Sequence, residues 1–115
     1  MVLQALASTL RKHFEVIGAA SGPAALEVLD REGAFPVVIS DYRMPGMSGA
    51  TFLSRVRERF PAAVRIMLTG AGAEGDDVTC NAGLVFRLLP KPCPRETLIR
   101  AIDEALERSR AVAAT

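Results

Sequence analysis

Three short apolar segments, each followed by a polar residue, do most to limit how this chain can fold. They are Val37–Ser40 before Asp41, Val64–Leu68 before Thr69, and Val85–Leu88 a short way before Lys91. Apolar runs of this length between turn signals are typical of buried strands. Because reactive groups gather at the carboxyl ends of strands in α/β sheets, the sequence predicts that an acid, a hydroxyl and an ammonium group converge at one rim.

Stretches with helical spacing separate these segments. Core-facing positions are expected at Leu3, Leu6, Leu10 and Phe14, at Leu26 and Leu29, at Phe52, Leu53, Val56 and Phe60, and at Leu98, Ile102 and Leu106. A further strand is expected over Val16–Ala20, and a short helix between Glu74 and Gly83. Strands and helices that alternate at intervals of about twenty residues favour parallel βαβ units. We therefore expect a three-layer α/β fold, with helices on both faces of a parallel sheet.

Local signals mark where some of these helices begin and end. Ser21, followed by Pro23, is expected to cap one helix, and Ser48 is expected to cap another after a Pro-Gly turn. At the far end the last helix is expected to fray beyond Arg108, with residues 110–115 as a tail.

Length and charge narrow the class of protein. The 115 residues suit one domain over 1–115, and 14 basic against 13 acidic residues leave a net charge of +1. That balance lacks the basic excess typical of proteins that bind nucleic acid. No apolar stretch approaches the roughly 18 residues of a membrane span, and no secretory signal opens the chain. We expect a cytoplasmic protein without direct nucleic-acid or membrane contact, in which Cys80 and Cys93 are reduced thiols.

Three motifs occur in an order and spacing that are distinctive when taken together. They are VVISDYRMPGMSG from Val37 to Gly49, the Thr69-Gly70 pair after Leu68, and Lys91-Pro92. In these motifs the chain resembles the CheY-like receiver domain of response regulators in two-component signalling. The resemblance runs from Leu3 to about Leu106. It implies a flavodoxin-like fold and a place in a phosphorelay.

The resemblance also implies roles for four residues. Asp41 would accept a phosphoryl group from a histidine kinase or phosphotransfer protein, Lys91 would pair with the phosphoryl oxygens, and Thr69 would bond to that group in the active state. Asp41 and the backbone carbonyl of Arg43 would bind Mg²⁺. Such cations suit the chemistry, because a carboxylate attacking an electron-rich phosphoryl centre needs its charge offset. A conformational change would then reach an output domain or partner protein, so the chain is not expected to be an enzyme.

The start of the chain departs from the family pattern. Receiver domains normally begin with a strand ending in an acidic pair that holds Mg²⁺, whereas this chain is expected to begin with a helix at Leu3. Glu15 is the only acidic residue among the first twenty, and it follows the helical pattern. We therefore expect the N-terminal strand to be missing and Mg²⁺ to bind weakly. The gap in the sheet would be closed by direct pairing of the flanking strands or by a homodimer.

Two differences concern signal transmission. Leu88 stands where the family usually has an aromatic switch residue, and Pro90 directly precedes Lys91 and removes a backbone donor. Together with the missing strand, these differences favour a second function, a phosphorylation-deficient, receiver-derived interaction module. A small hydrolase is a third alternative, but the sequence has no nucleophile elbow and no Gly-rich phosphate loop.

The singled-out residues also have plainer interpretations. Asp41 can satisfy turn amides, Thr69 can cap a turn, and Lys91 can be a solvated loop cation. The pair Asp76-Asp77 suits a helix start better than a metal site. The remaining candidates fit ordinary positions: His13, Arg108 and Arg110 on the surface, and Phe86 and Leu88 in the core.

Overall fold

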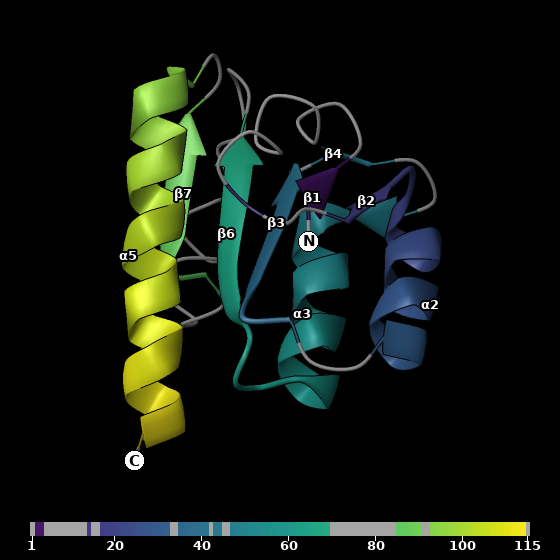
Figure 1. Cartoon of the computed structure of the whole chain (residues 1–115). Coiled ribbons are helices and arrows are strands. Elements are labelled where there is room, and N and C mark those ends of the chain that lie inside the picture. The colour runs from purple at the N-terminus through teal and green to yellow at the C-terminus, as the bar shows by residue number, and fades with distance from the viewer. Residues whose placement is uncertain are drawn as a thin grey trace.

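Three parallel strands form the centre of the molecule. The structure is a computed structural model that describes residues 2–3, 14, 17–32, 35–41, 43–44, 47–69, 85–90 and 93–114. Within these residues, β3 (Val37–Asp41), β6 (Val64–Thr69) and β7 (Arg87–Pro90) lie side by side in the order β3-β6-β7 (Figure 1). Each pair is parallel, so the carboxyl ends of all three strands reach the same rim.

Two shorter strands continue the row beyond β3. Strand β1 (Val2–Leu3) is parallel to β2 (Gly18–Ala19), and β1 lies beside β3 (Figure 1). The predicted helix start at Leu3 was therefore wrong, because Val2 and Leu3 form a strand at the position we expected to be vacant. Spacing of apolar residues cannot separate a short buried strand from a helix start. The rest of that predicted helix, up to residue 13, lies outside the described residues.

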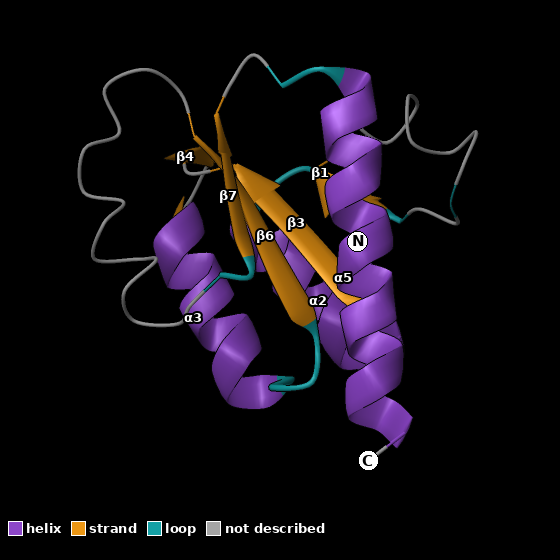
Figure 2. Ribbon diagram, turned by 90° about the vertical axis from the view of Figure 1, so that its left-hand side faces the viewer, coloured by secondary structure: helices purple, strands orange, loops and turns teal. Residues whose placement is uncertain are grey.

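Helices cover both faces of the sheet, as predicted. Side chains alternate between the two faces of a strand, so Val37, Ile39, Ile66 and Leu68 pack towards α5 (Arg95–Ala114). Val38 and Met67 instead pack among side chains of α2 (Gly22–Glu32) and α3 (Gly49–Arg59). Figure 2 shows the strands between these two helical layers. A strand covered on both sides is apolar along most of its length, which explains the run that identified β3.

The predicted helix caps at Ser21 and Ser48 are confirmed. The Ser21 hydroxyl accepts a hydrogen bond from the backbone N–H of Ala24 at 3.2 Å, and the Ser48 hydroxyl accepts one from Thr51 at 3.1 Å. Each bond satisfies a donor that the first helical turn leaves open. The ion pair between Arg59 and Asp30, at 2.9 Å, also ties α3 to α2 on the surface.

Some boundaries differ from the predicted ones. The last strand was expected over Val85–Leu88, but β7 begins at Arg87 and ends at Pro90. Phe86 approaches β6 first, through a 2.7 Å hydrogen bond from its N–H to the carbonyl of Arg65. Pro90 is compatible with the end of this strand, where fewer ladder bonds are required.

Other boundaries also differ from the predicted ones or fall among residues that the structure does not describe. Strand β2 covers Gly18–Ala19 of the expected Val16–Ala20; residues 17 and 20 lie outside the strand, and residue 16 is not among the described residues. Helix α5 continues to Ala114 instead of fraying after Arg108, which suits the high helix propensity of its alanines. The helix predicted between residues 74 and 83 lies outside the described residues. Among the helices the structure describes, none combines the length and apolar character needed to cross a bilayer.

Candidate functional site

Strand register brings two of the predicted site residues to one rim. Asp41, the last residue of β3, pairs with Leu68 of β6, and Thr69 follows as the last residue of β6. Thr69 in turn pairs with Pro90 at the end of β7. The predicted neighbourhood of Asp41 and Thr69 at adjacent strand ends is therefore confirmed. Lys91 lies outside the described residues, directly after Pro90 in the chain.

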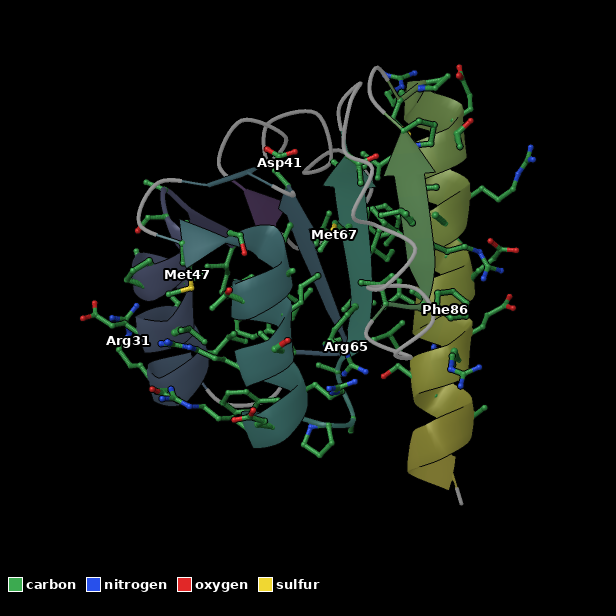
Figure 3. The ribbon with its side chains drawn as sticks, turned by 180° about the vertical axis from the view of Figure 1, so that it is seen from behind. Arg31, Asp41, Met47, Arg65, Met67 and Phe86 are labelled. Atoms are coloured by element: carbon green, nitrogen blue, oxygen red, sulfur yellow. The ribbon has the colours of Figure 1, made fainter. Side chains whose placement is uncertain are left out.

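Asp41 sits where a carboxylate is partly shielded and still near the surface. The residue is half-buried, and its Oδ1 atom is shielded from solvent. Figure 3 shows its carboxylate at the upper end of β3, at the far end of the sheet from Arg65. A carboxylate in this position can meet a reactant arriving at the rim of the sheet.

Ser40 is a structural partner that the sequence interpretation missed. It is fully buried at 0% exposure, and its hydroxyl donates a 2.8 Å hydrogen bond to the backbone carbonyl of Asp41. A buried hydroxyl is stable only when such a partner is available. The signal in the sequence was a single hydroxyl residue at the end of an otherwise apolar strand. Thr69, at 8% exposure, is the other buried polar residue among those described.

A small hairpin follows Asp41. Strand β4 (Arg43–Met44) pairs antiparallel with β5 (Met47–Ser48), and Ser48 then caps α3. The sequence predicted only a turn at this point, because two-residue strands leave no alternating pattern to recognise. Arg43, whose backbone carbonyl is the second expected Mg²⁺ ligand, lies in the first strand of this hairpin.

The described residues supply few ligands for a metal. No group of three or more His, Cys, Asp or Glu residues gathers in the part of the chain that the structure describes. Mg²⁺ commonly uses one or two carboxylates and completes its shell with waters and phosphate oxygens. Asp41 with one backbone carbonyl fits that pattern in its sparsest form.

Two residues assigned to the core have different surroundings. Leu88 is half-buried and packs against the core on the α2 and α3 side, as predicted. Phe86 packs against the core on the α5 side, but it also lines a surface pocket together with Arg108. The expectation that Phe86 is only a core residue and Arg108 only a solvated one was therefore incomplete.

Comparison with known proteins decides the family. Residues 1–103 match the family described as response regulator receiver domain. The chain belongs to this receiver domain family. Its curated relatives include the transcriptional regulatory protein GlrR of Escherichia coli K12, 38% identical over 96 residues that span 84% of this chain and 21% of GlrR. The sensory transduction protein RegX3 of Mycobacterium tuberculosis is 38% identical over 104 residues, which span 90% of this chain and 45% of RegX3.

Solved structures agree with this assignment. A response regulator receiver domain protein from Clostridium thermocellum superposes with a TM-score of 0.86 at 28% identity, covering 96% of this chain and 89% of that one. A structure described as adenylate cyclase from Rhodopirellula baltica gives a TM-score of 0.91 at 32% identity, covering 98% and 89% of the two chains. The predicted flavodoxin-like receiver fold is thus confirmed. This receiver spans about a fifth of the length of the first curated relatives it matches.

Family membership places the receiver in two-component signalling. Some of its relatives carry regulatory names, such as the transcriptional regulatory protein GlrR and the sensory transduction protein RegX3. That this chain has no enzyme activity of its own stays a prediction, as does its cytoplasmic location.

Proposed function

We propose that this receiver accepts a phosphoryl group on Asp41 from a histidine kinase or phosphotransfer protein. The observation that carries the proposal is the register of the sheet, which sets Asp41 and Thr69 at neighbouring strand ends. Lys91 follows β7 at the next strand end in the sequence. With Lys91 at the same rim, the site would combine a carboxylate nucleophile with a hydroxyl and an ammonium group that offset charge on the phosphoryl oxygens.

The transfer follows from the chemistry of these groups. A carboxylate oxygen of Asp41 attacks the phosphorus atom of a phosphohistidine. The phosphorus–nitrogen bond breaks, its electron pair returns to the imidazole, and an acyl phosphate remains on Asp41. The Lys91 ammonium group offsets negative charge on the phosphoryl oxygens, and the Thr69 hydroxyl donates a hydrogen bond to one of them in the phosphorylated state.

Mg²⁺ belongs to this proposal as a weakly held cofactor. Asp41 and the backbone carbonyl of Arg43 would hold it, with waters and phosphoryl oxygens completing the shell. When bound, the ion neutralises charge on the phosphoryl group. With one side-chain carboxylate and one backbone carbonyl as its proposed protein ligands, the site is expected to need a high Mg²⁺ concentration, and phosphorylation is expected to be slow.

Intact-mass spectrometry of the chain tests the proposal. Incubation with Mg²⁺ and a small phosphodonor such as phosphoramidate should add one phosphoryl group slowly, and Asp41→Asn should abolish the addition. Asp103→Asn is the matched control, because Asp103 is an exposed carboxylate on α5. Addition that persists in Asp41→Asn would refute the assignment. Rapid addition lost in Asp41→Asn would keep the assignment and show that the weak metal site was undervalued.

A second function is favoured by the same sparse site. With one rim carboxylate among the described residues and Leu88 where the family usually has an aromatic switch residue, the receiver can also act as an interaction module that needs no phosphorylation. It would then bind an output domain, a partner protein or a second copy through the face formed by β7 and α5. Partner binding that is equal for the wild type and Asp41→Asn, with or without phosphodonor, would support this function over the first.

A further inference from the structure

A pocket opens at the end of the sheet opposite to Asp41. Its volume is about 460 Å³, within the size range of small-ligand sites. The turn at residues 61–63 lines it together with Arg65, Phe86, Arg87 and Arg108. Arg65 lies near the start of β6 and Arg87 at the start of β7, whereas Asp41 ends β3. Figure 3 shows Arg65 and Phe86 well away from Asp41, at the lower end of the strands.

Each of the three arginines in the pocket is positioned by an identified contact. Arg65 donates a 2.9 Å hydrogen bond from Nη1 to the carbonyl of Ala63, and Arg87 donates one of 3.0 Å from Nη1 to the carbonyl of Phe86. The guanidinium carbons of Arg87 and Arg108 lie 4.2 Å and 5.5 Å from the centroid of the Phe86 ring. These contacts hold the three guanidinium groups, from two strands and one helix, around the pocket. Less side-chain conformational entropy is therefore lost when a ligand binds.

Positive charge predominates among the described residues that line this pocket. Among the described residues that line it, three are arginines and none is acidic. Glu104 is the nearby carboxylate, and its Oε1 lies 3.7 Å from Nη2 of Arg87. Burial, and secondarily the positive charge of Arg57, lower the pKa of the Arg65 guanidinium. The surroundings of Arg65 therefore disfavour its charged form, and an anion bound beside it would favour that form.

We propose that this pocket binds a small oxyanion carrying two or more phosphoryl or carboxylate groups. Guanidinium groups bind both kinds of oxygen through paired hydrogen bonds, and three of them around one cavity favour a ligand with more than one anionic group. The site is separate from the phosphoacceptor rim, which is formed by the strand ends at Asp41 and Thr69. Anion binding in the pocket does not depend on phosphorylation of Asp41. Exposed Arg87 and Arg108 form part of it, so its affinity falls as salt rises.

Titration of the chain with two anions tests the proposal. Pyrophosphate and the tricarboxylate tricarballylate are added in low-salt, magnesium-free buffer, and binding is followed by calorimetry and by amide NMR shifts. An Asp41→Asn background removes the rim carboxylate from the experiment. We expect saturable binding with a dissociation constant below about 1 mM for one anion or both, and the tighter anion identifies the preferred group.

Two variants and one control locate the binding. Arg108→Gln and Arg65→Gln should each weaken affinity about tenfold or more. Arg100→Gln makes the same charge change on an exposed position of α5, about 12 Å along the helix axis from Arg108, and should change affinity less than about twofold. Arg108 is exposed, so its variant should keep the fold, which the amide spectrum verifies.

Three results would overturn the proposal. They are the lack of saturable binding for both anions, equal weakening by Arg100→Gln and Arg108→Gln, and shifts that gather near Thr69 instead of Arg65. The first would show that the arginines serve only to pack the turn. The second would mean attraction by general charge, and the third would place the anion at the phosphoacceptor rim.

Discussion

Ser40 fixes the backbone at the residue that the proposed chemistry depends on. Its buried hydroxyl donates to the carbonyl of Asp41, so the end of β3 is held by a side chain as well as by the β6 ladder. Loss of one partner from a buried hydrogen bond leaves the other group without compensation. The rim is therefore sensitive to a change that removes a single oxygen atom.

Ser40→Ala should lower the free energy of unfolding by about 1 kcal/mol. Urea denaturation followed by circular dichroism measures the change. Ser109→Ala on α5 is the control and should stay within about 0.5 kcal/mol of the wild type, because a helix tolerates alanine well. A Ser40→Ala protein as stable as the wild type would show that the hydrogen bond contributes nothing net.

The Cys93 thiol is expected to lose its proton at a higher pH in the folded chain than in the unfolded chain. Burial raises the pKa of its thiol, so the folded state favours the neutral form. The resulting stabilisation is fully present below the pKa of the unfolded thiol and is lost as pH rises through the folded pKa. The rate of alkylation by iodoacetamide at Cys93, followed by peptide mass, should therefore reach half its maximum at a higher pH in the folded chain than in urea. Coincident pH profiles would contradict the shift.

The positions of two site residues could be predicted from the sequence. Asp41 and Thr69 each follow directly on an apolar run typical of a buried strand, so the order of these runs indicated that the two residues share one rim of the sheet. The arginine pocket was not, because Arg65, Phe86 and Arg108 lie far apart in the sequence. The one clue was Arg65 itself, a charged residue within the otherwise apolar Val64–Leu68.

At the scale of elements, capping signals gave the most reliable boundaries. Ser48 ends the β4–β5 hairpin and caps α3, so one hydroxyl supports both the structure after Asp41 and the helix beside it. Boundaries without such a signal were shifted. Strand β7 begins two residues later than predicted because its register follows the pairing of Ile66 with Arg87, which is a tertiary contact.

Ser48→Ala should destabilise the chain by about 1 kcal/mol, since the N–H of Thr51 loses its acceptor. Ser48→Asp keeps an acceptor at the same position and should retain most of the stability. Thermal or urea unfolding of the two variants side by side gives the comparison. Equal loss in both would mean that Ser48 acts through contacts other than the cap.

At the scale of the whole molecule, β6 links the two ends of the sheet. Arg65 and Thr69 lie on the same face of this strand, one at the arginine pocket and the other at the phosphoacceptor rim. Met67 lies between them and is fully buried. One strand therefore carries a residue of each proposed site.

Among the described residues, the short strand β1 leaves part of β3 without a neighbouring strand on that side. This strand has two residues, whereas β3 has five, so β1 can cover only part of the length of β3. Two apolar residues added ahead of Met1 should raise the melting temperature, since they extend β1 beside β3 and supply backbone partners. Thermal melts of both forms measure this. An unchanged melting temperature in the longer chain would contradict the expected gain in backbone pairing.

The most direct test of the central proposal is to identify the residue that carries the phosphoryl group. After phosphodonor treatment, borohydride reduces an acyl phosphate to an alcohol and releases phosphate, which converts a phosphorylated aspartate into homoserine. Peptide mass mapping should then find homoserine at position 41, with the other acidic residues unchanged. Homoserine or its glutamate-derived counterpart at another position, with Asp41 intact, would contradict the account.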